Sequence, residues 1–112
     1  MSVAQKWLCL RVYMDEARHF NGKPLFEAIV LQAREKGLAG ATVWRSPLGY
    51  GHSQLLHNAN ILRLSENLPM VVEIMDAEDK IRDFLPQIQQ MAEDGIMTLQ
   101  MVDVIKLHKT TV

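Results

Sequence analysis

Polar and apolar residues alternate from Trp7 to Met14, which is the pattern of a β-strand with two different faces. One face carries Leu8, Leu10, Val12 and Met14. The other face carries Trp7, Cys9, Arg11 and Tyr13. Both faces are apolar enough to be covered, so we expect this strand to lie inside a sheet.

The period changes to that of a helix after Pro24, a residue that suits the first turn of a helix. Glu27, Arg34 and Glu35 fall outside the apolar stripe, and Gly37 suits the left-handed position that follows a helix. The sequence therefore predicts an amphipathic helix that ends near Gly37. Its stripe consists of Leu25, Phe26, Ile29, Val30 and Ala33.

The remaining chain predicts three further strands and one further helix. Strands are expected at 41–45, at 70–75 and at 97–107, the last as one strand or a bulged pair. Asp76 is expected to cap the second helix and Gly95 to end it. Pro86 should kink or break that helix, because proline lacks the N–H that a helix interior requires. Its apolar stripe consists of Ile81, Phe84, Leu85, Ile88, Met91 and Ala92.

This order of elements, βαββαβ, predicts an α+β, ferredoxin-like fold: an antiparallel sheet with two helices on one face. The face opposite the helices would then carry Trp7, Tyr13 and Met75. Such an apolar face favours self-association. Arg11 and Glu73 lie on neighbouring strands of the same face and could pair inside an assembly.

Composition narrows the class of protein. A chain of 112 residues fits one domain, 1–112, and a net charge of −1 gives no reason to expect nucleic acid as a partner. The apolar runs are too short to span a membrane, and the first residues lack the pattern of a secretory signal, so a soluble cytoplasmic protein is expected. Cys9, the single cysteine, is interpreted as a packed apolar residue.

A long loop is expected at about 46–60, after Pro47, Gly49 and Gly51. Its length favours a functional, mobile segment. The chain around it resembles the PII signalling proteins, which carry a Gly-x-x-Gly-x-Thr-Val strand and then a Gly-aromatic-Gly loop entrance. The matching residues are Gly37, Gly40, Thr42, Val43, Gly49, Tyr50 and Gly51. The resemblance extends through residues 68–95 and is closest to the uncharacterised PII-like family of this length.

The resemblance implies a homotrimer whose sheets face inward, with a small effector in clefts between subunits. That effector would be an adenine nucleotide such as AMP, bound near Gly40, Thr42, Gly49 and Gly51. Arg45 and Lys106 are further ligand candidates, although Arg45 also suits a salt bridge at the end of a strand. The loop would act on a transporter or an enzyme.

This chain departs from the nitrogen regulators after the second helix. The resemblance implies a glycine-rich phosphate-binding segment at this place, but the sequence here reads EDGIMTLQMV and only Gly95 remains. A smaller charge such as a monophosphate therefore fits better than a triphosphate.

Two other functions compete with this interpretation. His52 and His57 could bind a metal in a trimer like the copper-tolerance proteins, although no third ligand lies nearby. An enzyme finds little support, because no nucleophile is placed beside a base. Arg18 could belong to a phosphate loop of the acylphosphatase type, but Asp15 and Glu16 oppose that charge.

Overall fold

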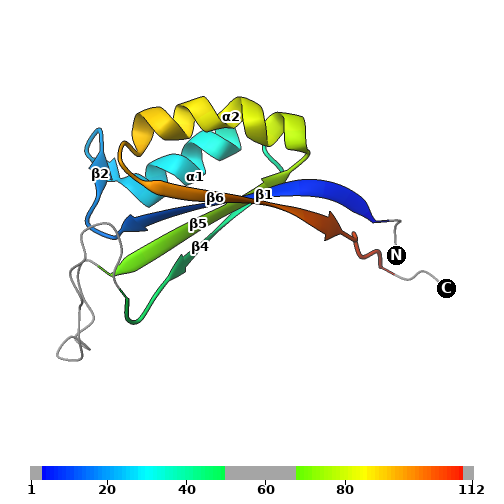
Figure 1. Ribbon diagram of the computed structural model, residues 1–112, viewed down its shortest axis with the longest axis horizontal. Helices are drawn as coiled ribbons and strands as arrows, with labels where there is room; N and C mark the ends of the chain where they lie inside the picture. Colours follow the sequence, from blue (N-terminus) through cyan, green and yellow to red (C-terminus); the bar gives the residue numbers. More distant parts are fainter. Residues whose placement is uncertain (1–3, 50–67, 110–112) are drawn as a thin grey trace.

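The computed structural model describes residues 4–49 and 68–109. These residues form a four-stranded sheet with two helices on one face, as Figure 1 shows. The predicted βαββαβ order is therefore confirmed, with one short hairpin added before the first helix. The elements are β1 Gln5–Asp15, β2 His19–Phe20, β3 Lys23–Pro24, α1 Leu25–Glu35, β4 Gly40–Arg45, β5 Pro69–Asp76, α2 Glu78–Met91 and β6 Ile96–Val104.

The strands follow the order β4-β5-β1-β6, and each neighbouring pair is antiparallel. Leu10 of β1 lies opposite Ile74 of β5 and Leu99 of β6, so the predicted inward face of β1 continues across the sheet. The final segment forms a single strand rather than a bulged pair.

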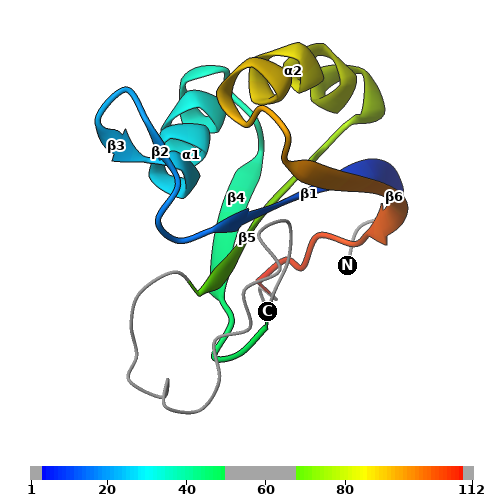
Figure 2. The same ribbon diagram turned by 60° about the vertical axis from the view of Figure 1, so that its left-hand side comes forward.

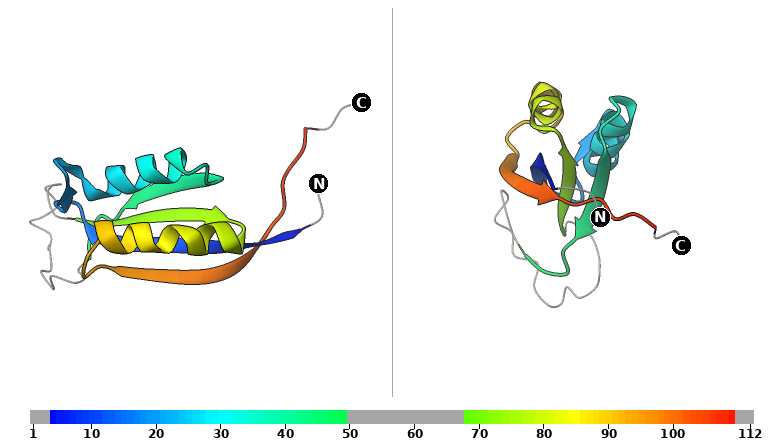
Figure 3. Two further views of the ribbon diagram at one scale, coloured as in Figure 1. Left: turned by 90° about the horizontal axis from the view of Figure 1, so that it is seen from above. Right: turned by 90° about the vertical axis from the view of Figure 1, so that its right-hand side faces the viewer.

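The core lies between the sheet and the two helices, which run side by side across it (Figures 2 and 3). Both helices bury the stripes that the sequence predicts, with Leu25, Ile29 and Ile81 fully buried. Each fully buried aliphatic side chain contributes about 1.5–3 kcal/mol to folding. These two stripes therefore hold the helices on the sheet.

Helix α1 ends as its sequence predicts. Gly37 has a φ of +75°, and its N–H bonds to the carbonyl of Arg34. The N–H of Leu38 bonds to the carbonyl of Ala33, which completes a Schellman motif. The motif turns the chain from α1 toward β4 and directs Leu38 against the core.

The expectations for the ends of α2 were wrong. Ala77, not Asp76, occupies the N-cap position, and no side chain caps the helix. The buried Asp76 carboxylate instead accepts hydrogen bonds from the N–H of Ala77 at 2.7 Å and of Ala39 at 3.0 Å. Asp76 thereby joins the end of β5 to the start of β4. At the other end α2 stops at Met91, and the residue with positive φ is Asp94 at +62° rather than Gly95.

Pro86 does not break α2, which continues through it from Glu78 to Met91. The prolyl ring is exposed, so the position that lacks an N–H lies on the solvent side of the helix. Helices curve convexly toward solvent and lengthen their hydrogen bonds there, which is where a missing bond costs least. The helix is therefore continuous despite the proline.

Candidate functional site

Strand β4 carries three of the predicted ligand residues and forms one edge of the sheet. Thr42 lies opposite Glu73 on β5, and Gly40 lies opposite Met75, so both belong to the face away from the helices. Arg45 lies opposite Met70, whose side chain belongs to the core between sheet and helices. Thr42 and Arg45 therefore lie on opposite faces of β4.

Arg45 forms the strand-end salt bridge that the sequence allowed as an alternative. Its Nη2 and Nε lie 3.1 and 3.2 Å from Glu16 Oε1. The carboxylate comes from the segment after β1, so the pair ties that segment to the end of β4. This contact reduces the charge that Arg45 offers to a ligand.

Hydrogen bonds also fix the chain on either side of residues 50–67. The N–H of Ser46 bonds to the carbonyl of Pro69 at 2.9 Å, and the N–H of Glu16 bonds to the carbonyl of Leu68 at 2.8 Å. Ser46 Oγ donates to the carbonyl of Leu48 at 2.6 Å and accepts from its N–H at 3.2 Å. These contacts hold the chain in place at Ser46 and Leu48 on one side and at Leu68 and Pro69 on the other.

Gly49 lies in this region, close to the ring of Pro69. A Cβ there would lie 3.2 Å from Cγ of Pro69 and 3.7 Å from Oγ of Ser46. The shorter contact is tight, so a larger residue at this position would require Pro69 to shift by a few tenths of an ångström. The other predicted loop residues, Tyr50, Gly51, His52 and His57, lie outside the described residues.

Lys106 lies beyond the end of β6, where its Nζ is 5.7 Å from the centroid of the Trp7 ring. This is the distance of a cation–π contact. Trp7 is near the start of β1, so Lys106 and Gly40 share one end of the sheet, whereas Gly49 is at the other end. One copy of the chain therefore does not gather the predicted ligand residues into a single site.

The face of the sheet away from the helices, which we call the open face, has a charged centre. Arg11 Nε lies 2.9 Å from Glu73 Oε2, which confirms the predicted pair, and Arg11 Nη1 donates to Gln100 Oε1 at 3.4 Å. Glu73 is only 9% exposed. Its hydrogen bond raises the pKa of the Arg11 guanidinium. Burial raises the pKa of the Cys9 thiol, and the negative charge of Glu73 raises it further.

A row of large apolar side chains crosses the open face beside this pair. Tyr13, Trp44 and Ile96 are 41%, 50% and 54% exposed. Tyr13 and Ile96 are register partners, and Trp44 lies opposite Val71. Trp44 and Ile96 were not predicted on this face, although alternation along β4 and β6 was the signal that could have placed them.

The described residues bear on two of the alternative functions. Within residues 4–49 and 68–109, no three histidine, cysteine, aspartate or glutamate side chains gather in a way that could hold a metal. Arg18, from the competing phosphate-loop interpretation, donates to the carbonyl of Glu93 at 3.1 Å. In the same described ranges, neither helix is long and apolar enough to cross a membrane.

Comparison with known proteins establishes the family. Residues 7–104 match the model of the family described as DUF190, "Uncharacterized ACR". The chain belongs to this family. A UPF0166 protein of Aquifex aeolicus (strain VF5) is 41% identical over 107 residues, covering 96% of this chain and 100% of that protein.

Solved structures of PII-like proteins share the fold of this DUF190 protein. One is CPII, a nitrogen regulatory PII-like protein from Thiomonas intermedia K12 bound to ADP, AMP and bicarbonate, with a TM-score of 0.66, 14% identity and 90% of each chain covered. Another is a proposed PII-like signaling protein from Thermus thermophilus, with a TM-score of 0.68 and 15% identity, covering 93% of this chain and 94% of that one. The chain therefore has the PII-like fold predicted from its sequence.

Proposed function

We propose that this DUF190 protein is a PII-like regulatory protein, not an enzyme, that binds an adenine nucleotide such as AMP in clefts between the subunits of a homotrimer. The observation that carries the proposal is the PII-like fold, together with the ADP and AMP bound by CPII. Nucleotide binding would change the loop at about 46–60, and the loop would engage a transporter or enzyme. The protein would act in the cytoplasm.

The open face supports an assembly. A row of exposed aromatic and aliphatic side chains lies there beside an ion pair whose carboxylate is nearly buried, which is the composition of a surface that another subunit covers. A ring of three copies uses two different patches of each subunit and leaves clefts between neighbours. In such a ring, the edge strand β4 of one subunit could lie against residues of the neighbouring subunit. This would bring Gly40 and Thr42 near a partner's residues.

Charge on the segment after α2 favours a ligand with few phosphates. Glu93 and Asp94 are exposed in the turn between α2 and β6. The resemblance to the nitrogen regulators implies a phosphate-binding segment at this place. Two carboxylates oppose a triphosphate by Coulomb repulsion. We therefore expect AMP to bind more tightly than ATP.

Isothermal titration of the full chain with AMP, ADP and ATP tests this proposal. We expect AMP to bind, and Thr42→Val to weaken it about fivefold through the loss of one hydrogen bond. Thr98→Val is the matched control, because Thr98 is also exposed on the open face but lies on β6, opposite Arg11. Absence of binding for all three nucleotides would refute the nucleotide site.

Hydrogen exchange tests the regulatory step separately. Saturating AMP should change amide protection in residues 46–60, because a ligand shifts a conformational equilibrium only when it prefers one state. The amides of Ile74 and Leu10 in the sheet core serve as an internal reference. Tight AMP binding with unchanged exchange in 46–60 would mean that the nucleotide does not act through this loop.

A further inference from the structure

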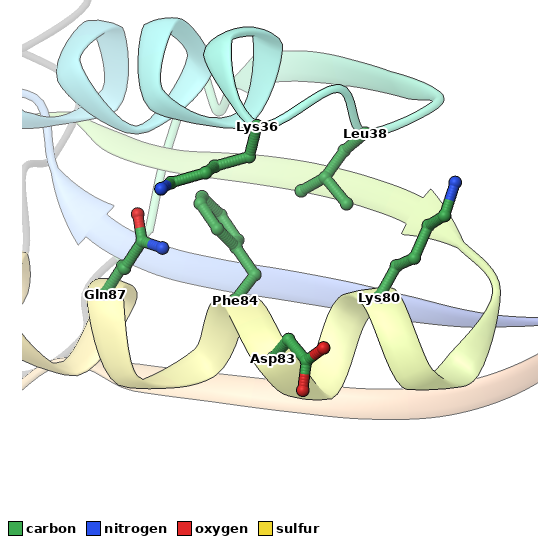
Figure 4. Close-up of a pocket in the computed structure, with 6 residues that line it drawn as sticks. All are labelled: Lys36, Leu38, Lys80, Asp83, Phe84 and Gln87. Atoms are coloured by element: carbon green, nitrogen blue, oxygen red, sulfur yellow. The ribbon is translucent and has the colours of Figure 1, made fainter.

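A pocket of about 300 Å³ opens between the end of α1 and the middle of α2, on the face of the molecule opposite the open face. Figure 4 shows the six side chains that line it. They are Lys36, Leu38, Lys80, Asp83, Phe84 and Gln87. Since the subunits of the proposed trimer would meet through the open face, this pocket would remain accessible in the assembly.

Hydrogen-bond donors dominate one side of the pocket. Gln32 Nε2 donates to Gln87 Oε1 at 2.8 Å, so the carbonyl of Gln87 is occupied by α1. The amide nitrogen of Gln87 is then left to donate, and Figure 4 shows it turned toward Phe84. In the same view the ammonium group of Lys36 lies on the same side of the pocket, nearer to the carbonyl oxygen of Gln87 than to its amide nitrogen. Together these two groups offer N–H donors and a positive charge.

Neither lysine of the pocket is paired with a carboxylate of the described residues. Among the described residues, neither Lys36 nor Lys80 forms an ion pair, and Asp83 pairs with neither of them. Figure 4 shows Asp83 directed away from α1 and from Phe84. Two ammonium groups and one carboxylate give the pocket a net positive charge.

Leu38 and Phe84 supply the apolar part. Phe84 is 2% exposed and belongs to the core, while the half-buried Leu38 packs against that core after the Schellman turn at Gly37. Both side chains are thus held by packing in the free protein. A ligand that covers Leu38 therefore loses little free energy to reorganisation of the protein.

We propose that this pocket binds a small organic acid. Its carboxylate would lie at Lys36 and the amide nitrogen of Gln87, and its apolar body would cover Leu38 above the buried ring of Phe84, with Lys80 adding attraction at the far end. The volume of about 300 Å³ lies at the lower end for ligand pockets. A short aliphatic or aromatic acid fits this space.

Chemical-shift titration of the ¹⁵N-labelled full chain tests the pocket with three probes: hexanoate, 1-hexanol and inorganic phosphate. Hexanoate combines charge with an apolar body, while the other two carry one property each. We expect hexanoate to shift the amide signals of Leu38 and Gln87 in a saturable manner. The other probes at equal concentration should shift them at least threefold less.

Variants separate this site from a general surface effect. Lys36→Gln and Lys80→Gln should each weaken hexanoate binding about three- to fivefold, as expected for exposed charges. Asp83→Asn should strengthen it about twofold by removing a repulsive charge. Arg34→Gln is the matched control, because Arg34 is also an exposed cation of α1 but does not line the pocket.

Two results would overturn the proposal: equal shifts with hexanoate and 1-hexanol, or Lys36→Gln and Lys80→Gln proteins that titrate like Arg34→Gln. AMP titration of the same variants keeps the two proposals distinct. The nucleotide site would involve β4, so Lys36→Gln should leave AMP binding unchanged whether or not hexanoate binds.

Discussion

Arg11 and Glu73 face each other across β1 and β5, and the carboxylate is nearly buried. Arg11→Met would leave Glu73 without its partner, and an uncompensated buried carboxylate destabilises a fold. We expect the melting temperature to fall by about 5 °C or more. The double variant Arg11→Met/Glu73→Leu should recover most of the loss, because a buried ion pair adds little beyond an apolar pair of similar size.

Thermal unfolding at one fixed protein concentration measures this effect, since an assembly makes melting temperature concentration-dependent. Lys6→Met is the control: Lys6 also pairs across the sheet, with Asp103 at 2.7 Å, but both side chains are more than 60% exposed. A double variant as unstable as Arg11→Met would show that the pair itself is required.

Cys9 gives a pH-dependent prediction. Burial and Glu73 raise the pKa of its thiol, so the folded protein keeps this proton at a pH at which the unfolded chain releases it. The stability that this provides is present below the thiol's unfolded pKa and is lost as pH rises through its folded pKa. Between about pH 8 and pH 10 the free energy of unfolding should therefore fall more steeply for the wild type than for Cys9→Ala.

Urea denaturation at several pH values would measure both slopes. The Cys9→Ala protein also loses a small amount of packing, but that loss does not vary with pH and leaves the comparison of slopes intact. Parallel slopes for the two proteins would contradict the stated perturbation of the thiol.

At the scale of elements, Pro86 lies inside a continuous α2 and removes one of its hydrogen bonds. Pro86→Ala would restore an N–H at an exposed position without changing the core stripe. We expect the free energy of unfolding to rise by about 1–3 kcal/mol, measured by urea denaturation. Gln89→Ala, exposed on the same helix, is the control and should change stability by less than about 0.5 kcal/mol.

A loss of stability in Pro86→Ala would mean that the prolyl ring is needed in this helix. Such a result would point to a contact of Pro86 in the assembled protein, because the side chain is exposed in a single copy.

The elements themselves were largely predictable from the sequence, and their ends were predictable where the determinants are local. At the end of α1 the N–H of Gly37 bonds to the carbonyl of Arg34 and the N–H of Leu38 to that of Ala33, so each bond joins residues within five positions along the chain. Asp76 was misinterpreted because one of its partners, Ala39, lies 37 residues away and leaves no local signal. Hairpin β2–β3 was missed because two-residue strands are too short to show a period.

At the scale of the whole molecule, alternation along β1 and β5 was sufficient to predict an apolar open face with Arg11 and Glu73 at its centre. Alternation along the strands did not predict which of the candidate ligand residues lie close together. Thr42 and Arg45 lie on opposite faces of β4, and Gly49 and Lys106 lie at opposite ends of the sheet, so one copy does not bring the candidate residues together. The pocket between the helices gave no sequence signal, because lysines at the ends and exposed sides of helices are common.

The open face gives the last prediction, which concerns assembly. If another subunit covers this face, a charge placed there must be buried without a partner, which strongly disfavours association. Tyr13→Glu should therefore convert the proposed trimer of about 38 kDa, three times 12.8 kDa, to smaller species at micromolar concentration. Leu31→Glu is the matched control, because Leu31 and Tyr13 are both 41% exposed but Leu31 lies on α1.

Light scattering coupled to size-exclusion chromatography measures the masses, and circular dichroism verifies that both variants are folded. Dissociation of Tyr13→Glu alone would locate the contact on the sheet, because the two substitutions add the same charge at sites of equal exposure. Dissociation of Leu31→Glu alone would instead assign the contact to the helical face and bury the pocket beside Lys36. A wild-type protein of 12.8 kDa in solution would refute the trimer and, with it, any nucleotide site between subunits.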